Sequence, residues 1–185
     1  KLYFEALRLG ELREKFAHAE PIVRMANMMT FDITAIRAAD ATGNAAAQPF
    51  GLTGEEACQL MWYAGMNEKM SSVSIAEYNP DLDDQHYSTG AIISTMIWYF
   101  IEGFYNRKDT GQFNSDQYTK YTVSFEGTDD TMTFFKSKLT EKWWMLVNYG
   151  ENFMDRAYIP CSYEDYTIAT HGDFPERWIK AQGKL

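Results

Sequence analysis

The sequence lacks the features that identify several large classes of protein. It contains no run of five or more basic residues and has a net charge of −9, so nucleic acid is not an expected partner. Its most apolar run, residues 91–104, is too short to span a bilayer and includes Glu102, which indicates a buried helix and no membrane anchor. No Pro-rich linker, low-complexity tract or internal repeat interrupts the chain. These absences favour an acidic, cytoplasmic protein without specifying its partner.

Cysteine and histidine are also scarce. Cys58 and Cys161 are far apart in the sequence and neither belongs to a metal-ligand pattern, so we expect two reduced, buried thiols. The three histidines, His18, His86 and His171, are isolated from one another. His86 follows an acidic loop and is a weak candidate for the mouth of a site. His171 near a helix end is more typical of a cation at the negative end of the helix dipole.

What the chain does contain is enough for a folded core. It has 185 residues, of which 45% are apolar and 16% aromatic, which is typical of one globular domain. Residues 1–25 follow a helical pattern, and Pro21 is expected to open a separate short turn of helix. The pattern starts at Lys1 with no capping residue and no initiator methionine, which is what a segment of a longer protein shows.

The most informative feature is a pair of apolar runs that each end in an acid. Residues 29–36 read as a buried strand that presents Asp32 to a loop, and residues 72–80 read as a second strand that presents Glu77. Between them Thr53 opens a helix with a capping box, and Gly65 is expected to close it in a left-handed conformation. Two strands joined through a helix are typically parallel, and chemistry gathers at the carboxyl ends of parallel strands. The sequence therefore predicts a site for a metal or a cationic substrate.

After residue 107 the pattern changes to antiparallel strands. Alternating residues predict strands over 119–125, 131–136 and 143–147, and Ser162 caps one more helix that ends near Gly172. The predicted fold is α/β: residues 1–107 form a parallel-sheet core, and residues 108–185 form an antiparallel strand and helix extension packed on the same domain.

Four short runs resemble motifs of the ureohydrolases, the superfamily that includes arginase and agmatinase. That family has a Ser-Phe-Asp-x-Asp-x-x-Asp-Pro strand end, an Ala-Pro-Gly loop, a Gly-Gly-Leu-Thr helix start and a strand that ends in Glu-Val-Asn-Pro. The matching runs, in the same order, are residues 30–34, 41–43, 50–53 and 77–80. Residues 54–66 and 96–107 are most similar to the bacterial formimidoylglutamase-like branch. The resemblance covers residues 4–107 and implies the C-terminal part of such a protein.

The resemblance implies a fold, a reaction and roles for single residues. The fold would be a three-layer αβα sandwich with a parallel sheet. The reaction would be hydrolysis of a guanidine or linear amidine C–N bond, for example of formimidoyl-glutamate to glutamate and formamide, by a hydroxide that bridges two Mn²⁺ ions. Asp32 would be a metal ligand and Glu77 would bind the cationic amidinium. The family commonly forms homo-oligomers, so a homo-oligomer is expected here.

Two departures from the family pattern bear on activity. Thr34 occupies the position of the second metal-ligand acid, and Arg37 occupies the position of the third. A neutral hydroxyl is a poor substitute for an anionic ligand of Mn²⁺. The family's other ligands, a histidine after Gly-Gly and an Asp-Ala-His-x-Asp strand end, have no counterpart in these 185 residues. Asp40, in the loop after Arg37, is a candidate replacement ligand.

Three hypotheses follow, and the sequence leaves all of them open. The chain belongs to an active amidine hydrolase, to a relative that lost its metals and serves as a binding or assembly subunit, or to a module that pairs with another chain. Purely structural roles also remain open: Asp32 as the cap of a turn, Glu77 as an acid held by backbone amides. Asp81, Asp83 and Asp84 lack the spacing of a calcium loop and indicate a solvated turn.

Overall fold

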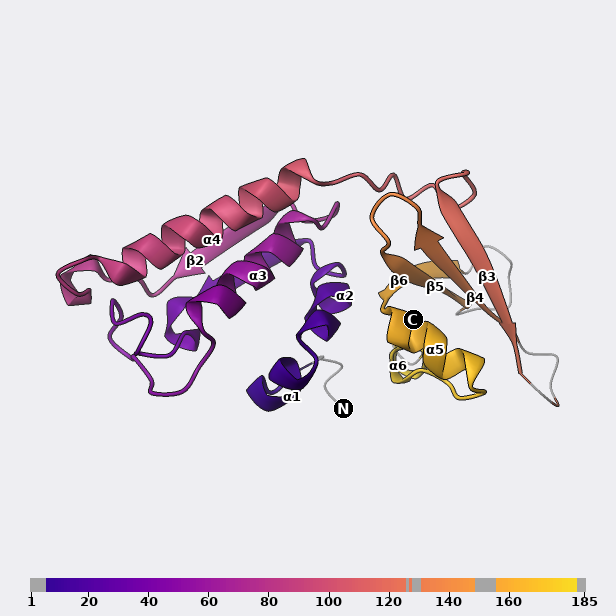
Figure 1. The fold of residues 1–185 in the computed structure, drawn as a ribbon, viewed down its shortest axis with the longest axis horizontal. Helices are drawn as coiled ribbons and strands as arrows, with labels where there is room; N and C mark the ends of the chain where they lie inside the picture. Colours follow the sequence, from indigo (N-terminus) through magenta and orange to yellow (C-terminus); the bar gives the residue numbers. More distant parts are fainter. Residues whose placement is uncertain (1–5, 126, 128–130, 149–155, 183–185) are drawn as a thin grey trace. The chain divides into compact units, whose positions relative to one another are not determined.

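The structure is a computed structural model that describes residues 6–125, 127, 131–148 and 156–182. The chain divides into two compact units, residues 6–107 and the residues from 108 onward. Each unit has its own secondary structure and its own core (Figure 1). The predicted fold class, mixed α/β with a parallel sheet followed by an antiparallel one, is confirmed.

The first unit is built from four helices and one parallel pair of strands. The elements run in this order: α1 (Leu9–Glu14), a 3-10 turn (Phe16–His18), α2 (Ala19–Val23), β1 (Met28–Asp32), a 3-10 turn (Ile33–Ala35), α3 (Gly54–Gly65), β2 (Ser72–Ala76), a 3-10 turn (Pro80–Leu82) and α4 (Ser88–Tyr105). The N-terminal helical pattern is thus broken into short pieces. Pro21 lies inside α2 and does not open it, contrary to the prediction.

The two strands are parallel and in register along their full length. Met28 pairs with Ser72 at one end and Asp32 pairs with Ala76 at the other. The crossover contains α3, which begins with the predicted capping box: the Thr53 hydroxyl accepts a hydrogen bond from the Glu56 amide at 3.1 Å, and the Glu56 carboxylate accepts one from the Thr53 amide at 2.8 Å. Both strands therefore end at the same edge of the sheet.

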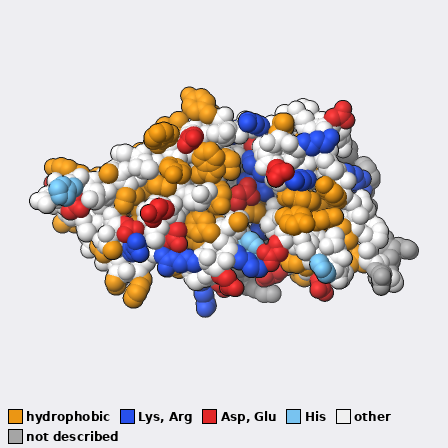
Figure 2. All heavy atoms as spheres, viewed as in Figure 1, with side chains coloured by type: hydrophobic (Ala, Val, Ile, Leu, Met, Phe, Trp, Pro, Cys, Tyr) orange, Lys and Arg blue, Asp and Glu red, His pale blue; other side chains and the backbone are white. Residues whose placement is uncertain are grey.

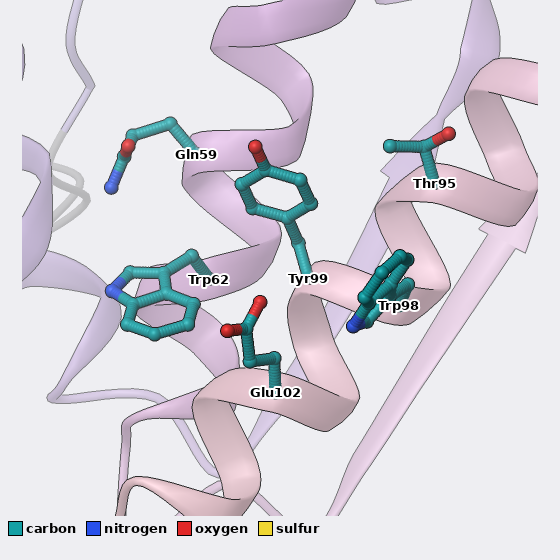
Figure 3. Close-up of a pocket in the computed structure, with 6 residues that line it drawn as sticks. All are labelled: Gln59, Trp62, Thr95, Trp98, Tyr99 and Glu102. Carbon is teal, nitrogen blue, oxygen red and sulfur yellow. The ribbon is translucent and has the colours of Figure 1, made fainter.

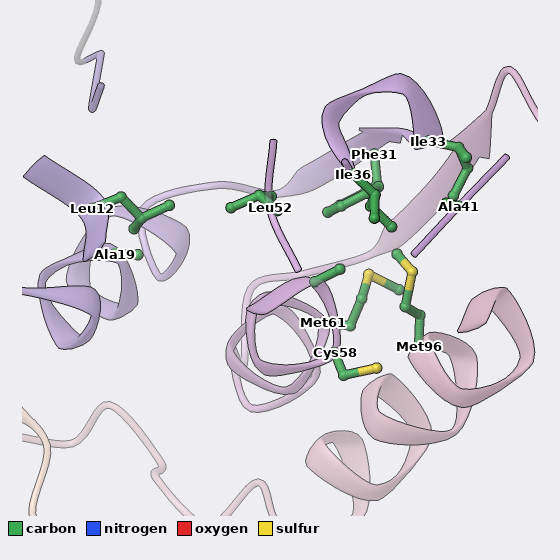
Figure 4. Packing of buried hydrophobic residues seen from close by; sticks show 11 residues of the cluster. Leu12, Ala19, Phe31, Ile33, Ile36, Ala41, Leu52, Cys58, Met61 and Met96 are labelled. Atoms are coloured by element: carbon green, nitrogen blue, oxygen red, sulfur yellow. The ribbon is translucent and has the colours of Figure 1, made fainter. Parts of the chain in front are cut away.

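The core of this unit lies between the strands and the two long helices. Figure 4 shows Phe31 and Ile36 packed near Met61 of α3 and Met96 of α4, and all four side chains are at least 95% buried. Cys58 is buried in the same cluster as a free thiol, as predicted. Burial of such side chains is worth about 1.5–3 kcal/mol each and fixes the helices against the sheet.

The prediction that Gly65 closes α3 in a left-handed conformation is wrong, and close packing of two helices explains why glycine stands there. Gly65 is the last residue of α3 and Met66 follows with φ −72°, so the helix has no left-handed closure. A Cβ on Gly65 would lie 2.2 Å from the Phe100 carbonyl oxygen, and one on Gly103 would lie 2.7 Å from the Trp62 carbonyl oxygen. The two glycines let the backbones of α3 and α4 touch.

The opposite side of α4 is not covered within the described part of this unit. Large apolar side chains at helical spacing are exposed there: Ile97, Trp98, Ile101, Phe104 and Tyr105. Figure 2 shows hydrophobic side chains at the surface over the C-terminal half of α4. No helix in the described residues is long and apolar enough to cross a membrane.

The second unit is an antiparallel sheet in the order β3–β4–β5–β6 with two helices. The elements are β3 (Tyr118–Ser124), β4 (Thr131–Ser137), β5 (Trp143–Asn148), β6 (Arg156–Cys161), α5 (Tyr163–Thr170) and α6 (Glu176–Gln182). The first three strands and the helix capped by Ser162 are confirmed, whereas β6 and α6 were missed. Phe134 and Met145 share one face with α5 and α6, and Phe135 and Trp144 pack on the other.

Candidate functional site

The candidate site is the sheet edge at which β1 and β2 end. Asp32 is the last residue of β1, and its strand partner is Ala76, the last residue of β2. Glu77 follows Ala76 directly, and both acids are exposed. Because neighbouring strands lie about 4.8 Å apart, the register brings the backbones of the two acids to adjacent positions on one edge. Their roles as metal ligand and substrate-binding residue remain predictions.

Asp32 is held by the turn that follows it. Its Oδ1 atom accepts two hydrogen bonds from Thr34, one from the backbone N–H at 2.8 Å and one from the hydroxyl at 2.7 Å. Asp32 is therefore the N-cap of the 3-10 turn Ile33–Ala35. Asp32 therefore also has the structural role that the sequence left open, as the cap of a turn.

Glu77 has an unusual backbone. Its φ of 68° lies in the left-handed region, where a residue with a side chain is disfavoured by about 1–2 kcal/mol relative to a right-handed or extended conformation. Strain of this kind persists only where surrounding contacts impose it, and it concentrates at functional sites. No pattern in the sequence predicts this conformation, because Glu77 reads there as the last residue of an ordinary strand.

The residues after Glu77 are held by contacts with the loop after β1. The Asn79 amide donates to the Gly43 carbonyl at 2.8 Å, and the Gly43 amide donates to the Thr89 hydroxyl at 2.9 Å. A Cβ on Gly43 would lie 2.9 Å from the Tyr78 ring, so only glycine fits. The loops that follow β1 and β2 are thereby tied to each other and to the start of α4.

Asp83 is the hub of this linkage. Its carboxylate accepts hydrogen bonds from the amides of Asp84, Thr89 and Gly90 at 3.0–3.1 Å and from the Tyr78 hydroxyl at 3.2 Å. Burial alone would raise the pKa of Asp83, but hydrogen bonds from Thr89, Gly90 and Asp84 outweigh it and lower the pKa to about 2. The sequence predicts that the acidic residues 81–84 form a solvated turn. Through Asp83 this turn also connects the loop after β2 to the start of α4. A sequence signal for this role was present: two adjacent aspartates precede Ser88 and Thr89, at the start of a helix whose free amides an acid can accept.

Arg37 and Asp40 neutralise each other beside the site. Arg37 Nε lies 2.9 Å from Asp40 Oδ1, and Asp40 Oδ2 accepts the amide of Gly54 at the start of α3 at 2.9 Å. Burial tends to raise the pKa of Asp40, yet the hydrogen bonds from Arg37 and Gly54 lower it below its usual value. Both oxygens of Asp40 are engaged, which argues against its use as a replacement ligand.

The described residues do not fit a two-manganese site. Within residues 6–125, 127, 131–148 and 156–182, no group of three or more His, Cys, Asp or Glu side chains lies close enough together to hold a metal ion. Asp32 has a hydroxyl and an amide as its near partners, where a second carboxylate would be needed. The histidines lie apart: His18 in the 3-10 turn after α1, His86 beside Gln85, and His171 at the end of α5 with Nδ1 2.7 Å from the Thr167 carbonyl oxygen.

Two solved structures share the fold of the first unit. Formiminoglutamase from Trypanosoma cruzi, determined with Mn²⁺, is 24% identical with a TM-score of 0.50, over 55% of this chain and 36% of that one. Formimidoylglutamase from Bacillus subtilis subsp. subtilis str. 168 is 19% identical with a TM-score of 0.50, over 56% of this chain and 34% of that one. This chain therefore spans about a third of the length of each.

Sequence comparison leads to the same group of proteins. No curated protein sequence matches the chain. Residues 4–102, more than half of the 185, match the Arginase family. The parallel strand pair, the capped crossover helix and the acid at each strand end all lie inside the matched segment. This chain belongs to the arginase family.

Proposed function

We propose that the chain forms part of a hydrolase that cleaves the C–N bond of a linear amidine. The substrate we favour is formimidoyl-glutamate, which water converts to glutamate and formamide. The observation that carries the proposal is the register of β1 and β2, which delivers Asp32 and Glu77 to adjacent places on one sheet edge. Likeness of fold to formiminoglutamase and formimidoylglutamase supports the same class of substrate.

Glu77 is assigned the cationic end of the substrate. A carboxylate pairs with a planar amidinium through two charge-assisted hydrogen bonds, which fixes both the position and the orientation of the reacting carbon. The left-handed backbone of Glu77 and the anchoring of the neighbouring residue Tyr78 by Asp83 support a carboxylate whose placement is imposed by its surroundings.

Asp32 is assigned to the metal side of the site. A carboxylate oxygen suits Mn²⁺, and the Thr34 hydrogen bonds hold this carboxylate in one orientation. Any further ligands of a manganese pair would have to come from outside the described residues. A homo-oligomer, a cytoplasmic location and packing of residues 108–185 on the arginase-like unit stay predictions.

The second candidate is a relative that lost its metals and acts as a binding or assembly subunit. Two observations favour it: Thr34 replaces the second ligand acid and uses its hydroxyl on Asp32, and Arg37 is neutralised by Asp40. The two candidates differ in metal dependence. In the second, a chelator leaves the melting temperature unchanged, whereas in the first a chelator lowers it, because bound metal stabilises the folded state.

The deciding experiment combines metal analysis with product analysis. Protein prepared with Mn²⁺ is analysed for metal content and for formamide released from formimidoyl-glutamate, in parallel with Asp32→Asn, Glu77→Gln and the control Glu55→Gln. The hydrolase proposal expects bound manganese and release of formamide that both site variants abolish and the control keeps. Metal-free protein without product, folded and insensitive to chelator, would favour the second candidate.

A further inference from the structure

A hollow on the outer side of α3 and α4 has the composition of a binding site for an organic cation. It has a volume of about 500 Å³ and is lined by Gln59, Trp62, Thr95, Trp98, Tyr99 and Glu102. Neither Asp32 nor Glu77 lines it, so it is separate from the candidate site at the sheet edge. Its walls are three aromatic side chains and one carboxylate, all on two helices that pack closely together.

The aromatic rings are open to a ligand. Trp98 is 64% exposed and Tyr99 38% exposed, and Trp62 is partly buried. Among the described residues, none of these three rings stacks on another ring. Figure 3 shows the carboxylate of Glu102 between the indoles of Trp62 and Trp98, with the ring of Tyr99 beside them. An aromatic ring attracts a cation that lies over its face, because the face of the ring is electron-rich.

Glu102 supplies a charge with no partner in the described part of the chain. Its carboxylate makes no hydrogen bond or ion pair there, although its backbone carbonyl accepts one from Asn106. The carboxylate is exposed, and it lies beside aromatic side chains on an otherwise apolar helix face. A cation that enters the hollow would meet both the carboxylate and the ring faces, whose attractions add.

The remaining polar groups narrow the class of cation. Besides Glu102, the polar side chains of the hollow are Gln59 and Thr95, and the Thr95 hydroxyl donates to the Ala91 carbonyl at 2.9 Å. A guanidinium carries five N–H donors that all need acceptors, and Glu102 is the one carboxylate among the residues that line the hollow. A methylated ammonium group needs none, because it is bound by ring faces and by the field of an acid.

We propose that this hollow binds a methylated ammonium group, with Trp62, Trp98 and Tyr99 as its walls and Glu102 as its counter-charge. The group is carried by a small molecule of the choline type. The proposal does not depend on the amidine hydrolysis, and either can fail without the other.

Fluorine NMR of the full chain labelled with 5-fluorotryptophan tests the proposal. The chain has five tryptophans, so five resonances are expected, and the variants Trp62→Phe and Trp98→Phe identify the two that belong to the hollow. Choline chloride is titrated at constant ionic strength against its neutral carbon isostere, 3,3-dimethylbutan-1-ol. We expect choline to shift the Trp62 and Trp98 resonances saturably, with a dissociation constant in the millimolar range, and the alcohol to do so at least threefold more weakly.

Glu102→Gln separates charge from apolar contact. It should weaken choline binding roughly threefold, the size of an exposed charge interaction, and leave binding of the alcohol unchanged. Glu14→Gln, which removes the same charge from an exposed position on α1 away from the hollow, should have no effect. Should Glu102→Gln fail to fold, Trp98→Leu at an exposed position serves instead, with the Trp62 resonance as the readout.

Three results would overturn the proposal. One is an equal response to choline and to the alcohol, which would indicate an apolar hollow without charge selectivity. Another is an unsaturable drift of all five resonances, which would indicate a bulk solvent effect. The third is no response of the Trp62 and Trp98 resonances to choline; if the chain also self-associates and Trp98→Leu abolishes the association, the hollow is part of an interface between copies of the chain.

Discussion

Thr34 donates both its backbone N–H and its hydroxyl to the same oxygen of Asp32, at 2.8 and 2.7 Å. These two hydrogen bonds bear on activity because Asp32 is the proposed metal ligand. Thr34 stands where the family's metal motif has a second acid. It stabilises the remaining acid, Asp32, through these two hydrogen bonds. Asp32 is thereby fixed at the end of β1 without any metal, and Thr34 is the first position at which metal affinity can be tested.

Thr34→Asp should increase the affinity of the chain for Mn²⁺. A second carboxylate two residues after Asp32 adds an anionic oxygen ligand where a hydroxyl now stands. Each tenfold gain in affinity adds about 1.4 kcal/mol to the free energy of unfolding at saturating metal, and the melting temperature in Mn²⁺ measures it. Thr34→Val is the control, since it removes the hydroxyl without adding charge. An equal Mn²⁺ response from both variants would show that this position does not face a metal site.

Glu77→Gly should stabilise the chain while it removes the proposed substrate contact. Glycine adopts the left-handed conformation of φ 68° without strain, which relieves about 1–2 kcal/mol, and the extra backbone entropy of the unfolded chain returns about 0.5–1 kcal/mol. A net gain of about 0.5–1 kcal/mol is expected in chemical denaturation. Glu77→Gln keeps the strained backbone and should show no gain. A loss of stability in the glycine variant would mean that the Glu77 side chain makes structural contacts that outweigh the strain.

Asp83→Asn should make the free energy of unfolding depend less on pH between pH 4 and pH 2. The ordinary pKa of an aspartate is 3.8, and that of Asp83 in the folded chain is about 2. The carboxylate therefore stabilises the fold above pH 3.8, and this stabilisation is lost as the pH falls towards 2. The variant lacks the titrating group and should be less stable than the parent at pH 6 but nearly equal to it near pH 2. Asp81→Asn, in the same turn, is the control, because the described residues offer its carboxylate no hydrogen bond. Parallel pH profiles for the parent and Asp83→Asn would contradict the assignment.

Gly103→Ala should destabilise the first unit by more than about 2 kcal/mol. The added Cβ would lie 2.7 Å from the Trp62 carbonyl oxygen and 3.0 Å from Gly65 Cα, so the two helices would have to separate. Gly10→Ala, in α1, meets no atom within 4 Å and should be neutral or stabilising by up to about 1 kcal/mol, because alanine favours helix. Urea unfolding of the two variants compares them directly. Tolerance of Gly103→Ala would show that the packing of α3 on α4 is looser than the structure has it.

Local signals in the sequence were sufficient for most of the elements. The Thr53 and Ser162 capping boxes mark the starts of α3 and α5, and alternation marks β3, β4 and β5. These signals work because a cap or an alternating strand depends on residues within a few positions of one another. The parallel pairing of β1 and β2 also followed, from the helix between them.

Features that depend on distant contacts could not be predicted. Strand β6 contains Pro160, and a proline argues against a strand in the middle of a sheet. Proline is tolerated here because β6 is an edge strand that pairs with β5 on one side only. Gly65 reads as a helix terminator, and only its approach to Phe100 shows that it is a packing residue. The left-handed Glu77 and the role of Asp83 arise from loops that meet in space, which no local pattern encodes.

The candidate site was predictable in part for the same reason. The motif placed Asp32 and Glu77 at strand ends, and the register brings those ends together. The neutralisation of Arg37 by Asp40, and the use of both Asp40 oxygens, required the coordinates of the loop and of the start of α3. Their roles in binding metal and substrate stay predictions.

The most direct test of the central claim is formamide release from formimidoyl-glutamate by Mn²⁺-treated protein, measured for the parent, Asp32→Asn and Glu77→Gln. The hydrolase proposal predicts product from the parent and loss of at least a hundredfold in both variants (about 2.7 kcal/mol of transition-state stabilisation), with folding unchanged by circular dichroism. Equal product formation by the parent and both variants, or none from a folded, manganese-loaded parent, would contradict it.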